Sequence, residues 1–95
     1  QAPQLPNKSQ MKFIFENEGL DVLEESFEPQ KKISEHRHPF CEIRMIVKGE
    51  MLFNIAGNQF LLREGDRVEI PANTKHSYTA QGSESCLSLC AFRAI

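Results

Sequence analysis

The sequence lacks the features that mark several classes of protein. It has only three cysteines, an odd number with no CxxC pair, which indicates neither a disulfide framework nor a cysteine-bound zinc site. A reduced, cytoplasmic setting is therefore expected, with one disulfide plus one free thiol as the alternative. No apolar run approaches the roughly 18 residues of a membrane-spanning helix. With a net charge of −2 and a pI of about 5.9, no basic patch stands out for nucleic acid.

The length and composition predict one domain. The chain has 95 residues, of which 40% are hydrophobic and 25% charged, and these proportions are typical of a soluble globular protein. Residues 1–10, QAPQLPNKSQ, are polar with two prolines and are expected to form a flexible lead-in rather than a signal peptide. A single domain is expected at 11–95, and Gln1 marks either a trimmed or a processed end.

Short β-prone segments separated by turn signals fill most of the chain. No segment has sustained helical periodicity, and a helix competes only within 16–28. The turns include Gly57-Asn58, a hairpin signal, and Pro71, which stops a strand. Many short, evenly spaced strands favour an all-β sandwich or barrel. About nine strands are expected, at 11–15, 20–28, 31–38, 42–48, 51–56, 59–62, 67–70, 75–80 and 86–92.

Three candidate metal ligands lie in the stretch HRHPFCEIRMIVKG, residues 36–49. Side chains two apart on a strand share one face, at roughly 6.5–7 Å, so His36 and His38 can converge on one ion. Glu42 has the same parity, although Pro39 weakens strict counting because it bends the chain. This spacing, with the glycine that ends the stretch, fills every fixed position of HxHxxxExxxxxxG. The stretch thereby resembles the first metal motif of the cupin superfamily.

A second stretch, GDRVEIPANTKH, resembles the second cupin motif, GxxxxxPxGxxHxxxN. Gly65, Pro71 and His76 match it. Asn73 replaces the motif's second glycine, and since asparagine tolerates the left-handed backbone conformation, the turn is expected to survive. Ala80 replaces the final asparagine of the motif. That position is often variable, so the replacement does not weaken the resemblance.

The resemblance covers roughly residues 22–92 and implies an all-β fold, a double-stranded β-helix (jelly-roll) cupin barrel. It implies one divalent transition metal ion per chain, either Fe, Ni, Mn, Zn, Co or Cu. Three imidazoles and one carboxylate leave one or two positions open for water and substrate. A barrel that kept these residues without a metal is disfavoured, because burying them without a cation is costly. The implied ligands are His36, His38, Glu42 and His76.

A closer similarity connects EHRHPFCEIR, GEMLFNI and REGDRVEIPANTKHSYT to the metal-binding part of acireductone dioxygenases, in which the glutamate ligand also precedes Ile-Arg. This similarity favours oxygen chemistry, so a metal-dependent dioxygenase acting on a small organic substrate is the first expectation. Lyase or isomerase chemistry follows closely. The alternative is a non-catalytic module that binds or senses a small molecule, and a regulator of this kind would need a DNA-binding part beyond these residues.

Two further residues share the parity of the ligands and are candidates for catalytic or substrate contacts. Arg44 could hold an anionic substrate or form a structural bridge with Glu42. Tyr78 could offer its hydroxyl to the substrate, although a barrel-filling role is favoured. Cys41 has the opposite parity, so packing is expected for it. By resemblance to other small cupins, a homodimer is expected, since a short chain gains from a partner subunit.

Overall fold

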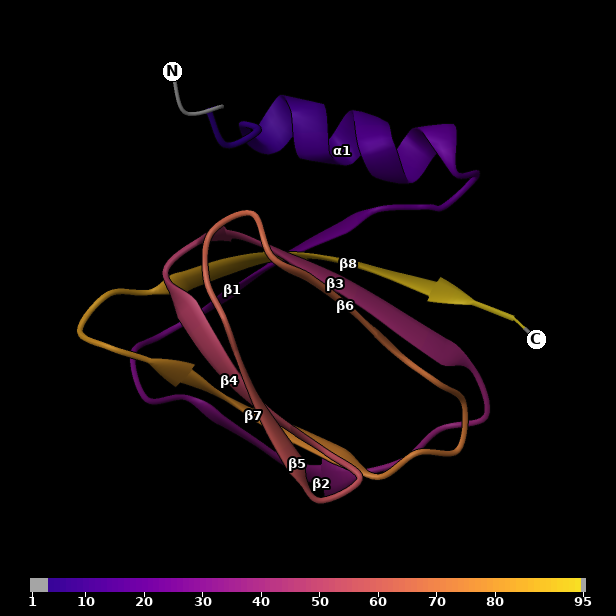
Figure 1. Ribbon diagram of the computed structural model, residues 1–95, viewed down its shortest axis with the longest axis vertical. Coiled ribbons are helices and arrows are strands. Elements are labelled where there is room, and N and C mark those ends of the chain that lie inside the picture. Colours follow the sequence, from indigo (N-terminus) through magenta and orange to yellow (C-terminus); the bar gives the residue numbers. More distant parts are fainter. Residues whose placement is uncertain (1–3, 95) are drawn as a thin grey trace.

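The computed structural model describes residues 4–94 as a barrel of eight antiparallel strands with one helix outside it (Figure 1). The elements are α1 (Lys8–Asn17), β1 (Leu23–Phe27), β2 (Lys32–His36), β3 (Cys41–Lys48), β4 (Glu50–Ile55), β5 (Asn58–Leu62), β6 (Arg67–Ile70), β7 (His76–Gln81) and β8 (Cys86–Arg93). They build two sheets, β1-β8-β3-β6 and β2-β7-β4-β5, which we call the helix-side sheet and the far sheet. The expected all-β jelly-roll barrel is confirmed.

The strand expected at 11–15 is wrong, because this segment lies within α1. The helix begins with a capping box: Asn7 Oδ1 accepts from the Gln10 backbone N–H at 2.9 Å, and Gln10 Oε1 accepts from the Asn7 backbone N–H at 2.8 Å. Met11 and Phe15, four residues apart, share the buried face. The other eight expected strands each correspond to one observed strand.

The helix also takes in the last three residues of the expected lead-in, while residues 1–3 lie outside the described residues. Between residues 4 and 94, no helix is long and apolar enough to cross a membrane.

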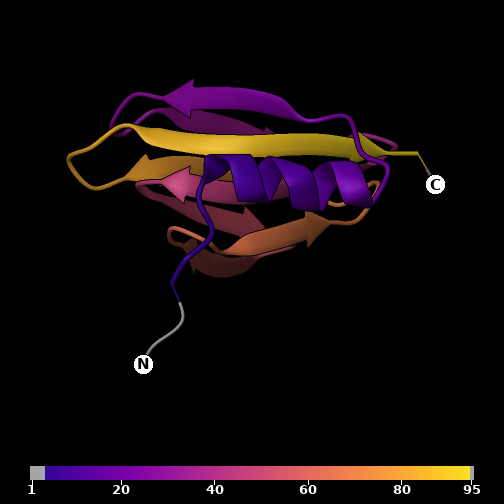
Figure 2. The same cartoon turned by 90° about the horizontal axis from the view of Figure 1, so that it is seen from above.

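Helix α1 covers the outer face of the helix-side sheet, next to β8 and β3 (Figure 2). Strand β3 is therefore enclosed on both sides: Ile43 and Met45 pack toward the helix, whereas Ile46 packs inside the barrel. Two apolar clusters result, one under the helix and one within the barrel, and they fix which side chains of β3 point inward. The cluster under the helix consists of Met11, Phe15, Leu20, Ile43, Met45, Leu89 and Ala91.

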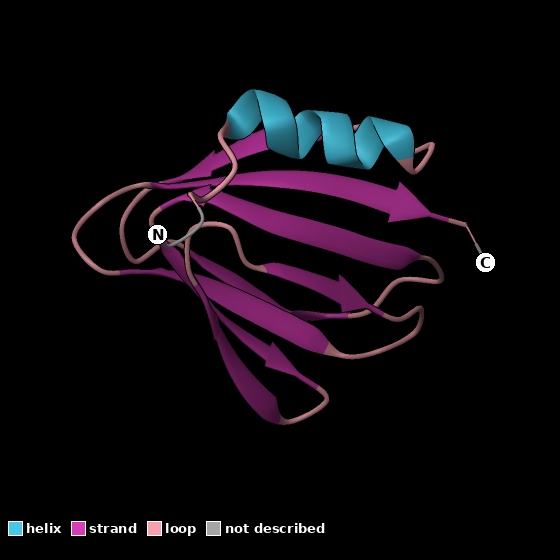
Figure 3. Cartoon of the chain, turned by 45° about the horizontal axis from the view of Figure 1, so that its top comes forward, coloured by secondary structure: helices cyan, strands magenta, loops and turns pink. Residues whose placement is uncertain are grey.

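The two sheets lie beneath the helix (Figure 3), and the strand connections bring the candidate ligands of both sequence motifs to one end of the barrel. His36, at the end of β2, pairs with His76, at the start of β7. The chain then crosses from the far sheet to the helix-side sheet, where β3 begins at Cys41. The antiparallel arrangement thus places the end of one strand and the starts of two others together.

Two of the three glycine positions of the motifs have a conformational cause. Gly49 has φ of +83° and lies against the loop before β8, where an added Cβ would stand 2.7 Å from the Ser85 carbonyl oxygen. Asn73 has φ of 59°, so the expected left-handed turn at the replaced glycine is confirmed.

Candidate metal centre

Four side chains that can bind a metal ion converge at one end of the barrel. Their candidate ligand atoms all lie within 4.8 Å of one another. Donor atoms held at 2.0–2.2 Å by one ion are at most about 4.4 Å apart, so a small contraction brings this set to ligand distances. The structure therefore brings together all four residues that the sequence predicted as ligands, which are His36, His38, Glu42 and His76.

The four residues come from both sheets and from the connection between them. His36 and His76 lie on the far sheet, and Glu42 lies on β3 of the helix-side sheet. His38 lies in the crossing segment rather than on a strand, so the strand geometry expected for it is wrong. Its ring still lies 4.9 Å from the His76 ring and 5.6 Å from the His36 ring, centroid to centroid. The site exists only when both sheets are assembled.

The three imidazole rings are oriented by the backbone. Each Nδ1 lies at hydrogen-bond distance from a carbonyl oxygen two residues away in the chain, and a carbonyl can only accept. Nδ1 therefore carries the proton, which in a neutral imidazole leaves Nε2 free as a ligand atom. The carbonyls belong to Ser34 for His36 at 2.8 Å, Phe40 for His38 at 2.9 Å, and Thr74 for His76 at 2.8 Å.

Two of the three free ring nitrogens face a carboxylate rather than a donor. Glu42 Oε1 lies 2.9 Å from His38 Nε2 and 3.4 Å from His76 Nε2. Since an unprotonated nitrogen and a carboxylate oxygen are both acceptors, a proton or a cation must lie between them. His76 Nε2 is buried and makes no hydrogen bond within residues 4–94. A metal ion would satisfy this atom, so the donor set fits one.

Glu42 is ionised despite being only 2% exposed. Burial alone would raise the pKa of its carboxyl group. The positive charge of Arg44 and the hydrogen bond that its guanidinium group donates outweigh burial and hold the pKa of Glu42 below its usual range. The site thus contains a permanent negative charge that a cation can neutralise.

Arg44 lies beside the ligands, but its guanidinium group is engaged by the protein. Its Nε donates to Glu42 Oε2, and its Nη2 donates to Tyr78 Oη at 2.9 Å. Tyr78 is itself buried between Phe27 and Phe53, with ring centroids 5.9 and 5.2 Å away. Burial raises the pKa of Tyr78 to about 12, although the charge of Arg44 opposes this shift, so the hydroxyl is protonated at neutral pH.

The sequence analysis missed two neighbours of the site, Glu25 and Ser88. Glu25 and Ser88 contact Arg44 from β1 and β8, and Phe92 lies edge-on to the His38 ring at 6.0 Å. Phe40 stacks on His38 with ring centroids 4.2 Å apart. Strand parity could have identified Glu25. It lies two residues before Phe27 on β1, so both side chains point to the same face, and Phe27 packs inside the barrel.

The three cysteines are free and none is a candidate ligand. Cys41 packs against the cluster under the helix, as its parity predicted. Cys86 and Cys90 are buried and share one face of β8, with Ser88 between them. Burial raises the pKa of the Cys86 thiol to about 11 and that of Cys90 to about 12.

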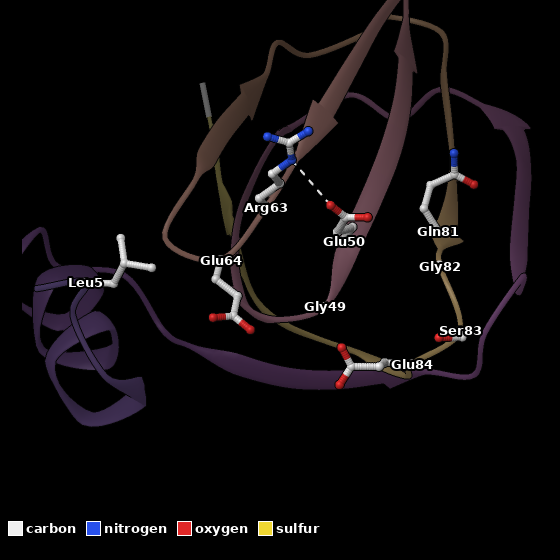
Figure 4. Close-up of a pocket in the computed structure, with 9 residues that line it drawn as sticks. All are labelled: Leu5, Gly49, Glu50, Arg63, Glu64, Gln81, Gly82, Ser83 and Glu84. Atoms are coloured by element: carbon white, nitrogen blue, oxygen red, sulfur yellow. Dashed lines mark ion pairs between the residues drawn. The ribbon is translucent and has the colours of Figure 1, made fainter.

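A pocket of about 580 Å³ lies at the opposite end of the barrel (Figure 4). Its wall includes the turn after β3 and the loop after β7, whereas the candidate metal ligands Glu42 and His76 lie near the beginnings of these strands. Arg63 Nε approaches Glu50 Oε2 at 3.3 Å within it. The pocket contains no metal ligand, and its lining residues are Leu5, Gly49, Glu50, Arg63, Glu64, Gln81, Gly82, Ser83 and Glu84.

Comparisons with known proteins agree with this architecture. An acireductone dioxygenase of Bacillus licheniformis is 33% identical over 82 residues, which cover 81% of this chain and 43% of the relative. The transcriptional activator RhaR of Salmonella arizonae is 35% identical over 69 residues, or 73% of this chain and 24% of the relative. The solved structure of an oxalate oxidase in complex with the substrate analogue glycolate superposes with a TM-score of 0.71 at 26% identity, over 80% of this chain and 42% of that one.

The chain therefore spans less than half the length of each of these proteins. The likeness is concentrated in the barrel, since the sequence profile of the cupin domain matches residues 23–92. This matched segment begins with the first residue of β1 and includes all four clustered ligands. Because the profile accounts for most of the sequence and for nearly the whole barrel, the chain belongs to the cupin family.

Proposed function

We propose that the protein is a metal-dependent enzyme that acts on a small organic molecule, with dioxygenase chemistry as the first choice. The observation that carries the proposal is the buried His76 Nε2, which has no hydrogen-bond partner in residues 4–94 and faces an ionised carboxylate. When bound, a divalent transition metal supplies Lewis-acid activation of a substrate oxygen or, as iron, activation of dioxygen. The ligands would be His36, His38, Glu42 and His76.

The residues around the ligands favour a substrate with an apolar part. Phe92 is 44% exposed and lies 5.0 Å edge-on from Phe40, which in turn stacks on His38. These rings give the solvent-facing side of the site an apolar wall that would exclude water from a bound substrate. Three histidines and one carboxylate leave coordination positions open for the substrate's polar end.

The relatives support oxygen chemistry without naming a substrate for this chain. Acireductone dioxygenase and oxalate oxidase both share the barrel over about four-fifths of this chain. Lyase or isomerase chemistry is the next choice, because the same open positions can polarise a substrate carbonyl without oxygen.

The second candidate function is a non-catalytic module that binds or senses a small molecule. The likeness to RhaR, a transcriptional activator, over 73% of this chain favours it. Such a module would bind a ligand at the same centre but would not turn it over.

Metal analysis followed by oxygen uptake tests the proposal. Protein purified without added metal should contain close to one transition-metal ion per chain, and His76→Ala should lose it. Lys75→Ala, which changes an exposed neighbour, is the matched control and should retain the ion. Iron-loaded protein should then consume oxygen with a member of a panel of enols, thiols and diols.

The outcomes separate the candidates. A metal-free wild type with unchanged behaviour in His76→Ala would contradict the metal site itself. Metal-loaded protein that binds a panel member tightly, without oxygen uptake or product, would favour the binding module.

A further inference from the structure

The two carboxylate oxygens of Glu42 have different surroundings. Oε1 faces the metal centre, 2.9 Å from His38 Nε2 and 3.4 Å from His76 Nε2. Oε2 points the other way and accepts the hydrogen bond from Arg44 Nε. Oε1 is therefore the oxygen that faces the candidate ligand nitrogens, while Oε2 is held by Arg44.

Arg44 is itself held in place from three other strands. Its Nη2 donates to Glu25 Oε1 on β1 at 2.8 Å and to Tyr78 Oη on β7 at 2.9 Å, and its Nη1 donates to Ser88 Oγ on β8 at 3.2 Å. The guanidinium carbon also lies 4.8 Å from the Tyr78 ring centroid and 5.6 Å from that of Phe27. With the residue only 2% exposed, the guanidinium group is confined to one orientation.

Glu25 is the outer end of this chain of contacts. It lies on the edge strand β1 and its side chain is 41% exposed, yet it reaches the buried Arg44. Its neighbour Glu24 points to the other face of the strand and pairs with Lys8 and Lys12 of α1. Two adjacent glutamates on one strand thus have separate functions, and only one of them is connected to the metal centre.

We propose that Glu25 and Arg44 form a clamp that positions Glu42, so that a single carboxylate oxygen is presented to the metal. The inference rests on the proposed metal site. A carboxylate without the clamp can rotate and offer both oxygens, which would occupy a coordination position needed by the substrate. Outer partners of metal ligands set ligand orientation in this way. Arg44 is accordingly a positioning residue, and its guanidinium group is not available to bind an anionic substrate.

Paired variants on β1 test the clamp with cobalt(II) as the probe. Glu25→Gln keeps the size of the side chain but removes the charge that holds Arg44, whereas Glu24→Gln makes the same change on the opposite face. Cobalt affinity is measured by competition with a chelator, and the visible spectrum of the cobalt-loaded protein reports coordination number and geometry. Glu25→Gln should weaken binding about tenfold and alter the spectrum, while Glu24→Gln should leave both as in the wild type.

Arg44→Met gives a second, stronger variant. It should weaken cobalt binding by up to about 100-fold and shift the spectrum in the same direction. If Arg44→Met does not fold, Glu25→Gln still decides the question, because its substitution is on a partly exposed side chain at the sheet edge.

Three results would overturn the clamp. If wild type and Glu25→Gln bind cobalt with the same affinity and spectrum, the clamp is wrong and the metal site stands. If Glu24→Gln and Glu25→Gln weaken binding equally, the effect is a general loss of stability, which also contradicts the clamp. If the wild type binds no cobalt, the proposed function and the clamp fail together.

Discussion

The backbone N–H of Asn73 donates to the carbonyl oxygen of His38 at 2.7 Å. This bond joins the two segments that supply the candidate metal ligands, since His38 belongs to the first motif and Asn73 precedes the candidate ligand of the second by three residues. Asn73 can make it because its backbone adopts the left-handed conformation, with φ of 59°. The conformation of one turn residue is therefore coupled to the position of a ligand in the other segment.

Substitutions at Asn73 should separate backbone conformation from side-chain chemistry. Asn73→Val should lower the free energy of unfolding by about 1–2 kcal/mol, because a β-branched residue disfavours positive φ. Asn73→Gly, which restores the motif's usual residue, should stay within about 0.5 kcal/mol of the wild type. Urea unfolding followed by circular dichroism measures both. A Val variant as stable as the Gly variant would contradict the conformational role.

Two glycines in turns between consecutive strands should respond differently to the same substitution. Gly49 and Gly57 both have positive φ, +83° and +85°, but an added Cβ meets the Ser85 carbonyl only at Gly49. Gly57→Ala should cost about 1–2 kcal/mol from the backbone alone. Gly49→Ala should cost about 1–3 kcal/mol more, because the loop before β8 must move. Equal losses of stability in the two variants, measured by thermal unfolding, would mean that the close approach of Gly49 to the Ser85 carbonyl does not affect stability.

Much of the candidate metal centre could be predicted from the sequence, because such a site is recognised by the types of its side chains and by their spacing, and the sequence shows both directly. Imidazoles and a carboxylate at the motif spacing identified all four residues that cluster in the structure. The spacing did not reveal that β2 ends at His36, which leaves His38 in the crossing segment. Parity correctly assigned Cys41 to the opposite face, toward the helix.

The helix and the clamp were not predictable in the same way. The segment 11–15 is β-prone in composition, and its helical signals are one buried pair, Met11 and Phe15, plus a cap at Asn7 inside a proline-containing stretch. Packing on the sheet decided its conformation. The contact of Glu25 with Arg44 joins β1 and β3, which are separated by β8 in the sheet. Parity predicts the face to which a side chain points, but it does not predict which residue of another strand lies beside it.

The cysteines should differ strongly in reactivity. Burial raises the pKa of Cys86 to about 11 and of Cys90 to about 12, from an ordinary value near 9, so both remain protonated at pH 8 while alkylation requires the thiolate. Cys41 is partly exposed and should be modified first. Mass spectrometry after iodoacetamide treatment should find one modified cysteine in native protein and three in urea. Early modification of Cys90 would show that the barrel opens readily.

The same two thiols imply a loss of stability at alkaline pH. A raised pKa in the folded state stabilises the protein fully below the unfolded value near 9, and this contribution disappears as pH rises toward the folded value. Unfolding temperatures measured with metal absent should therefore fall above about pH 9. Cys86→Ala with Cys90→Ala should reduce the slope of that fall.

The expected homodimer can be tested directly. Phe60 and Leu61 lie on opposite faces of the edge strand β5, and both are more than 40% exposed. Exposed apolar side chains on an edge strand favour association. Light scattering should give a mass near twice the 10.9 kDa of one chain. A single-chain mass at millimolar concentration would contradict the prediction.

Metal binding should weaken steeply as pH falls. Protons and the ion compete for the same imidazole nitrogens, so binding releases protons and each histidine ligand adds to the pH dependence. An ion that binds only the folded protein also raises its stability in proportion to the logarithm of the metal concentration over Kd. The unfolding temperature of cobalt-saturated protein should therefore exceed that of metal-free protein at pH 8, and the difference should shrink toward zero by pH 5. His76→Ala should show little difference at either pH, while Lys75→Ala should follow the wild type. A difference that is constant from pH 8 to pH 5 would count against three histidine ligands.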